Sequence, residues 1–97
     1  MEPISSLSRI NVYSFITGAS GSEDVEVAFT TPGVEPAEED WHIASWGTPT
    51  SQGCPARILV GPGGGAVALS DGTYEMWVRV TGPVQQPVLR AGLVPVT

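Results

Sequence analysis

Apolar and polar residues alternate along short runs of this chain, and Gly or Pro marks most of the breaks between the runs. The stretch 25–30, VEVAFT, shows the pattern clearly, because its valines and its phenylalanine fall at every second position. A period of two is that of a strand with one buried face. No window has the period of a long helix, and residues 36–40, a proline followed by acids, predict one helical turn at most. The sequence therefore predicts an all-β fold.

Seven short strands are predicted, separated by turn clusters rich in Gly, Pro and Ser. They are residues 10–17, 25–30, 41–46, 56–60, 67–69, 73–81 and 88–97. About seven strands in 97 residues suit a single immunoglobulin-like antiparallel β-sandwich. The length fits one domain, residues 1–97, with no internal repeat.

Charge excludes some partners. The chain has ten acids and four arginines, a net charge of −6, so it lacks the clustered cations that phosphate backbones and anionic membrane surfaces require. No apolar run approaches the length of a membrane span. The first residues lack a basic start followed by an apolar block, so we expect no secretory signal. We expect neither nucleic acid nor membrane as a partner.

Residues 61–66, GPGGGA, match one form of the dinucleotide-binding fingerprint, G-x-G-x-x-A. That site needs a helix directly after the glycines, so that its amides face the pyrophosphate. Only four residues separate Ala66 from the turn signal Asp71-Gly72, and Pro62 removes a backbone amide. We therefore interpret the glycines as a connection between two strands.

The run Asp71-Gly72-Thr73-Tyr74 precedes alternating apolar residues. In immunoglobulin-like sandwiches a tyrosine near the start of the sixth strand bonds back to the backbone at the corner. Tyr74, with Gly72 two residues before it, fits this tyrosine corner. Its ring is expected to fill the core while its hydroxyl satisfies a backbone carbonyl.

The last two strands are predicted to form a hairpin centred on residues 84–85, with Arg79 opposite Arg90 and Trp77 opposite Gly92. One face is apolar throughout and is assigned to the core; it carries Tyr74, Met76, Val78, Val80, Leu89, Ala91 and Leu93. The outer face carries Glu75, Trp77, Arg79, Arg90, Gly92 and Val94.

Trp77 is expected to cover Gly92 on this outer face, as an aromatic side chain protects a weak strand position. Arg79 and Arg90 would repel each other, and Glu75 lies too far along to neutralise both. A carboxylate from a neighbouring strand or an acidic partner would do so. Trp77, Arg79 and Arg90 are therefore the candidate interface, and one tryptophan of the segment 41–46 is also expected to point outward.

The polar residues do not form a catalytic pattern. His42 is the only histidine; Asp40 shares its face of the predicted strand, but Ser45 lies on the other, so no serine-hydrolase triad is predicted. One histidine and one cysteine, Cys54, are too few for a zinc site, and Cys54 is interpreted as an incidental loop or half-buried thiol. The acids of 23–24 and 35–40 are interpreted as solubilising charge, with a weak calcium site and a glycosidase-type carboxylate pair left open. We expect no catalytic residue, no cofactor and no metal.

The run 56–97 resembles the C-terminal half of small β-sandwich proteins encoded by tailed phages and prophages of actinobacteria, and ISSLSRINVYSF and EEDWHIASW are similar to the same group. The resemblance covers most of the chain. Its most specific parts are Asp40-Trp41, Trp46, Ala56-Arg57, Gly72-Thr73-Tyr74, Trp77-Val78-Arg79-Val80 and Ala91-Gly92. Pro95 departs from it, because proline removes a ladder donor; the last strand is expected at a sheet edge or broken there.

The resemblance implies a non-enzymatic virion structural protein, made in the host cytoplasm and located in the virion. It would be a capsid decoration protein or a head–tail component. Its partners would be other virion proteins, in a symmetric assembly of many copies. The alternative is a secreted carbohydrate-binding or adhesion module that uses Trp77 as a stacking platform, against which the missing signal sequence speaks.

Overall fold

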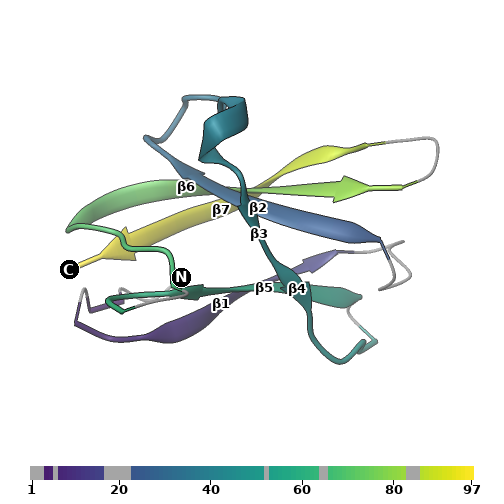
Figure 1. Cartoon of the computed structure of the whole chain (residues 1–97), viewed down its shortest axis with the longest axis horizontal. Coiled ribbons are helices and arrows are strands. Elements are labelled where there is room, and N and C mark those ends of the chain that lie inside the picture. The colour runs from purple at the N-terminus through teal and green to yellow at the C-terminus, as the bar shows by residue number, and fades with distance from the viewer. Residues whose placement is uncertain (1–3, 6, 17–22, 52, 64–65, 83–85) are drawn as a thin grey trace.

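The computed structural model describes residues 4–5, 7–16, 23–51, 53–63, 66–82 and 86–97. Within them, seven strands form two antiparallel sheets that lie one above the other (Figure 1). The smaller sheet has the order β1-β5-β4, from β1 (Ile10–Ile16), β5 (Cys54–Val60) and β4 (Ser45–Trp46). The larger sheet has the order β3-β2-β6-β7, from β3 (His42–Ile43), β2 (Asp24–Thr30), β6 (Gly72–Thr81) and β7 (Val88–Val96). The predicted all-β, two-layer fold is confirmed.

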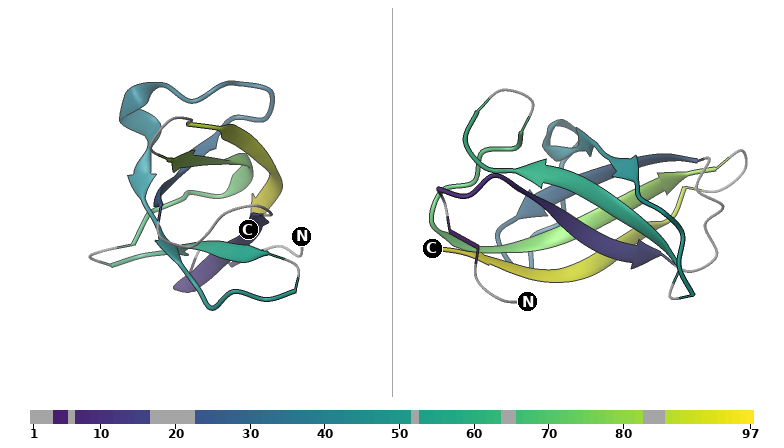
Figure 2. Two further views of the ribbon diagram at one scale, coloured as in Figure 1. Left: turned by 90° about the vertical axis from the view of Figure 1, so that its right-hand side faces the viewer. Right: turned by 90° about the horizontal axis from the view of Figure 1, so that it is seen from below.

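Two predicted strands differ from the structure. The segment 41–46 is not one strand but two, because the chain leaves the larger sheet after β3 and joins the smaller one as β4 (Figure 2, left). Ala44 lies at the crossing, where its N–H donates to the carbonyl of Val25 at 3.0 Å. The predicted strand 67–69 is reduced to a single parallel bridge between Val67 and Val60.

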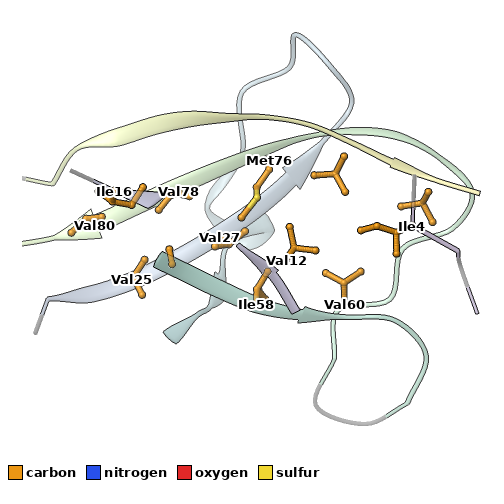
Figure 3. Packing of buried hydrophobic residues seen from close by; sticks show 13 residues of the cluster. Ile4, Val12, Ile16, Val25, Val27, Ile58, Val60, Met76, Val78 and Val80 are labelled. Carbon is orange, nitrogen blue, oxygen red and sulfur yellow. The ribbon is translucent and has the colours of Figure 1, made fainter. Parts of the chain in front are cut away.

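The core lies between the two sheets and is built from side chains at alternate strand positions (Figure 3). Val12 and Ile58 come from the smaller sheet, and Val27 and Val78 come from the larger one. These side chains are almost fully removed from water. Because the single cysteine precludes an intrachain disulfide, the sheets are held together by this packing.

We call residues 31–41, the connection between β2 and β3, the strap; it stands beyond the larger sheet (Figure 1). It contains a single 3₁₀ turn, η1 (Glu38–Asp40), as the proline and acids of 36–40 predicted. The Asp40 carboxylate accepts the N–H of Ala37 at 2.8 Å, while the N–H of Asp40 donates to the carbonyl of Ala37 at 3.0 Å. Asp40 therefore stabilises the start of the turn and is not simply solubilising charge.

Candidate functional site

Trp77 lies on the outer face of the larger sheet, as predicted, but it is only 5% exposed. Its Nε1–H donates to the hydroxyl of Thr30 at 3.0 Å. The guanidinium carbon of Arg90 lies 4.9 Å from the ring centroid, so this cation covers the ring. The prediction that Trp77 is an exposed platform is wrong, because a neighbouring cation and the adjoining strand bury it.

Arg79 is buried beside Trp77 and is neutralised within the chain. Its guanidinium pairs with Glu26 of the adjacent strand β2 at 2.9 Å and with Glu38 of the strap at 2.8 Å. Trp41 stacks on it, with 4.5 Å between the guanidinium carbon and the ring centroid. The expected carboxylate from a neighbouring strand is confirmed.

Electrostatics in this cluster keep Arg79 charged. The hydrogen bond with Glu38 raises the pKa of Arg79 above its ordinary value, and the bond and charge of Glu26 act in the same direction, whereas burial opposes them. Glu75, also buried, accepts the N–H of Gly33 from the strap at 3.0 Å. The outer face at β6 is therefore a polar layer beneath the strap, and its buried charges are paired within the chain.

The predicted β6–β7 register is wrong. Trp77 pairs with Arg90, Arg79 pairs with Val88, and Gly92 pairs with Met76. A β-bulge between Met76 and Trp77 leaves one extra residue in β7. Arg90 is consequently separated from Arg79, and its exposed side chain lies 4.0 Å from a carboxylate oxygen of Glu75.

The bulge also changes which β7 side chains face the core. Val94 and Val96 belong to the buried cluster, whereas Leu93 is 52% exposed. The expectation of Leu93 inside and Val94 outside is wrong, because one inserted residue exchanges the two faces of a strand. Leu89, also expected inside, is partly exposed near the start of β7. β7 continues through Pro95 as an edge strand, where proline is tolerated.

The predicted tyrosine corner is present. The Tyr74 hydroxyl donates to the carbonyl of Ser70 at 2.8 Å, and its ring packs against the core. Gly72 has φ of +146°, a conformation that L side chains rarely adopt. The backbone hydrogen bond that the sequence predicted for Tyr74 is therefore present, and Gly72 precedes it in a conformation that favours glycine.

The glycine-rich segment connects β5 to the run before β6, although residues 64–65 of the fingerprint lie outside the described residues. The N–H of Gly61 donates to the carbonyl of Val67 at 2.9 Å, which closes the connection. Gly61 has φ of +135°, and a Cβ there would overlap the backbone of Ser8. Close packing of the backbone therefore explains why position 61 is a glycine. The described residues that follow, from Ala66 to Ser70, are not helical.

The remaining candidate residues are dispersed. His42 is exposed on β3, and Ser45 on β4 accepts a hydrogen bond from Nε of Arg57 at 3.0 Å. Cys54 is buried at the first position of β5, so the expectation of a loop or half-buried thiol is wrong. Within the described ranges, no three His, Cys, Asp or Glu side chains gather as a metal site would require. In that same part of the chain, no helix has the length and apolar character of a membrane span.

Exposed aromatic side chains lie on the smaller sheet. Tyr13 and Phe15 occupy alternate positions of the edge strand β1, on its outer face, and are 50% and 46% exposed. Arg57 is directly opposite Tyr13, and Pro55 is opposite Phe15. The sequence carried a signal for this face, because the run 10–17 has apolar residues on both sides, but the predicted candidate interface lay on β6 and β7.

A groove of about 940 Å³ opens along the side of the sandwich where the chain passes from β3 in the larger sheet to β4 in the smaller one. It is lined by the stretches 41–45, 57–59 and 66–69, together with Asn11 and Phe29. Trp46, by contrast, packs on the core, with its Nε1–H donating to the carbonyl of Glu23 at 2.7 Å. Both tryptophans of the 41–46 segment are half-buried, and Trp41 is the one that lines this groove.

Charge is distributed unequally over the two sheets. The strands of the smaller sheet contain one ionisable cation, Arg57, and no carboxylate. The larger sheet and the strap carry Asp24, Glu26, Glu35, Glu38, Glu39, Asp40 and Glu75. The groove lining has Arg57 and His42 but no acid among the described residues.

Comparison with known proteins identifies no relative: no family model matches the chain, and no curated protein or solved structure is significantly similar to it.

Proposed function

We propose that this chain is a non-enzymatic, immunoglobulin-like structural protein of a tailed-phage virion, which docks on its neighbours through the outer face of the smaller sheet. The observation that carries the proposal is the pair of half-exposed aromatic side chains, Tyr13 and Phe15, on the edge strand β1. Exposed aromatic groups gathered on one face are typical of protein interfaces.

Strand order supports the immunoglobulin-like part of the proposal. In that fold the second and fifth strands pair in one sheet, and the third, sixth and seventh pair in the other. If β1 stands for the second strand, the pairing of β1 with β5 and the order β2-β6-β7 match this arrangement. The hydrogen bond from Tyr74 to Ser70, at the start of β6, is where the tyrosine corner occurs.

The docking face has a chemistry suited to a protein neighbour. Besides Tyr13 and Phe15 it offers one cation, Arg57, and no carboxylate from its strands, so the net charge of −6 resides elsewhere. The acidic larger sheet would then face solvent. In a capsid decoration protein or a head–tail component, many copies bind a repeated lattice, so a modest interface for each copy suffices.

Incorporation into particles tests the proposal. We expect mass spectrometry of virions from the phage or prophage that encodes this chain to detect the protein. The double variant Tyr13→Ser/Phe15→Ser should remain folded by circular dichroism and be depleted from purified particles at least tenfold. Leu93→Ser, which alters an equally exposed residue of the larger sheet, is the matched control and should be incorporated normally. Absence of the chain from mature particles, or normal incorporation of the double variant, would refute the proposal.

A secreted carbohydrate-binding module is the second candidate. Its platform at Trp77 is closed by Arg90, but Trp41 lines the groove beside Asn11 and His42, a combination of an aromatic ring and polar groups that suits a sugar. A glycan array would show binding that disappears in Asn11→Ala if this candidate were correct. A blank array would remove it.

A further inference from the structure

Ile43 is the most exposed large apolar residue among those the structure describes, at 90%. It lies on β3, the short edge strand of the larger sheet, and it lines the groove. Exposure of an isoleucine side chain to water is unfavourable, and a partner that buried it would gain binding free energy. Its place between the strap and β4 makes it the centre of a candidate contact.

The groove beside Ile43 favours negative charge. Arg57 is its only arginine, and the hydrogen bond with Ser45 uses just Nε of the guanidinium. Its two terminal nitrogens have no carboxylate among the described residues. His42 also lines the groove. A segment that entered here with carboxylates would therefore find a cation to pair with.

The strap supplies such a segment directly next to the groove. Residues 35–40, EPAEED, directly precede the stretch 41–45, which lines the groove. Glu38 is held by Arg79, but Glu35 and Glu39 are exposed and take part in no described ion pair. The acidic segment, the exposed Ile43 and the groove are thus consecutive parts of one surface.

We infer that this surface binds a second copy of the chain about a two-fold axis, so that the acidic segment of each copy enters the groove of the other. A two-fold interface is self-complementary, since each patch contacts its counterpart on the partner. Ile43 lies near the axis, where the two copies cover each other's side chain. Arg57 of each copy faces the acidic segment of the other. This contact goes beyond the proposed function; it shares Arg57 with the docking face but uses neither Tyr13 nor Phe15.

Sedimentation velocity on the purified chain tests the inference. We expect a monomer–dimer equilibrium between about 5 and 500 µM, with a dissociation constant on the order of tens of micromolar. Raising the salt from about 0.05 to 0.5 M should weaken the dimer several-fold, because the charges that face each other are screened. Ile43→Asp should be monomeric throughout. Leu93→Asp places the same charge at an exposed leucine outside the groove and should dimerise like the unmodified chain.

Charge reversal separates the contact from a general loss of structure. Arg57→Glu and Glu39→Arg should each weaken the dimer at least tenfold. The chain that carries both changes should regain most of the affinity, because every copy then presents the reversed pair. Circular dichroism confirms that each variant is folded. Four results would each overturn the inference. The unmodified chain could stay monomeric at about 500 µM, or the Ile43→Asp variant could still dimerise. Leu93→Asp could lose as much dimer affinity as Ile43→Asp, or the double charge reversal could fail to regain it.

Discussion

Two arginines on the outer face of the larger sheet each stack on a tryptophan, but their surroundings differ. Arg79 is buried between two carboxylates and Trp41, whereas the side chain of Arg90 is 60% exposed and has one long contact with Glu75. An ion pair that solvent reaches contributes little, since water and salt screen it. Removal of a buried cation leaves its partners unpaired, which costs far more.

We therefore expect Arg79→Gln to lower the free energy of unfolding by about 2 kcal/mol. Arg90→Gln, the matched variant, should lower it by only about 0.5 kcal/mol. Urea titrations followed by tryptophan fluorescence measure both values. Equal losses in the two variants would contradict the stabilising role of the ion pairs around the buried Arg79.

The tyrosine corner gives a second test on single atoms. Tyr74→Phe keeps the ring in the core but removes the hydroxyl that donates to the Ser70 carbonyl. The expected loss is about 1 kcal/mol, which lowers the melting temperature by roughly 5 °C. Tyr13→Phe removes an exposed hydroxyl with no described hydrogen bond and should leave the melting temperature unchanged. Equal melting temperatures of Tyr74→Phe and the unmodified chain would show that the bond does not stabilise the corner.

Whether a residue's role could be predicted from sequence depended on how local its contacts are. The bond of Tyr74 spans four residues, so the run around it predicted the corner. A carboxylate from a neighbouring strand was predicted beside Arg79, although its residue was not, because adjacent strands of one sheet bring opposite charges together. The burial of Trp77 was not predicted, since it depends on Thr30, 47 positions away, and on an arginine displaced by the bulge.

At the scale of an element, the bulge in β7 decides the arrangement of the C-terminal strand. Gly92 has φ of +116°, a conformation open to glycine at little cost, and no atom lies near the position of a missing Cβ. The backbone can therefore insert one residue beside Met76. A constant register is the simplest assumption for a hairpin, and an alternating pattern cannot reveal where it fails.

Truncation of neighbouring residues in β7 distinguishes the two registers. With the bulge, Val94→Ala opens a cavity in the core and should cost about 2 kcal/mol. Leu93→Ala removes more atoms but from an exposed side chain, so its cost should stay below about 0.5 kcal/mol. Chemical denaturation of the two variants gives the comparison. A larger loss of unfolding free energy in Leu93→Ala than in Val94→Ala would support the register without a bulge.

The strands themselves were largely predictable because each is a local pattern bounded by turn residues. Boundaries of the long strands agree with the alternating runs within two residues. The crossing at Ala44 was not predictable in the same way. The stretch 41–46, WHIASW, has the pattern of one extended strand, and only the positions of both sheets show that its halves pair with different strands. The same crossing creates the groove, so the groove could not be predicted either.

At the scale of the whole molecule, both sheets depend on one shared core. Val12 comes from β1 and Val27 from β2, and each belongs to the single buried cluster between the layers. In the part of the chain that the structure describes, neither sheet has another covered apolar face large enough to stabilise it alone. The outer side of the smaller sheet is exposed at Tyr13 and Phe15, and that of the larger sheet is a polar layer around Arg79. The two layers should therefore unfold together.

Matched valine truncations in the two layers test this cooperativity. Val12→Ala and Val27→Ala should each lower the free energy of unfolding by about 2 kcal/mol, because both open a cavity in the same core. Both should shift one common melting transition by roughly 10 °C, with far-ultraviolet and near-ultraviolet circular dichroism changing at the same temperature. Val34→Ala, at an exposed valine of the strap, makes the identical chemical change and should leave the transition in place. If either core variant instead split the transition in two, the sheets would be separate units, and the crossing at Ala44 would join them only through the chain.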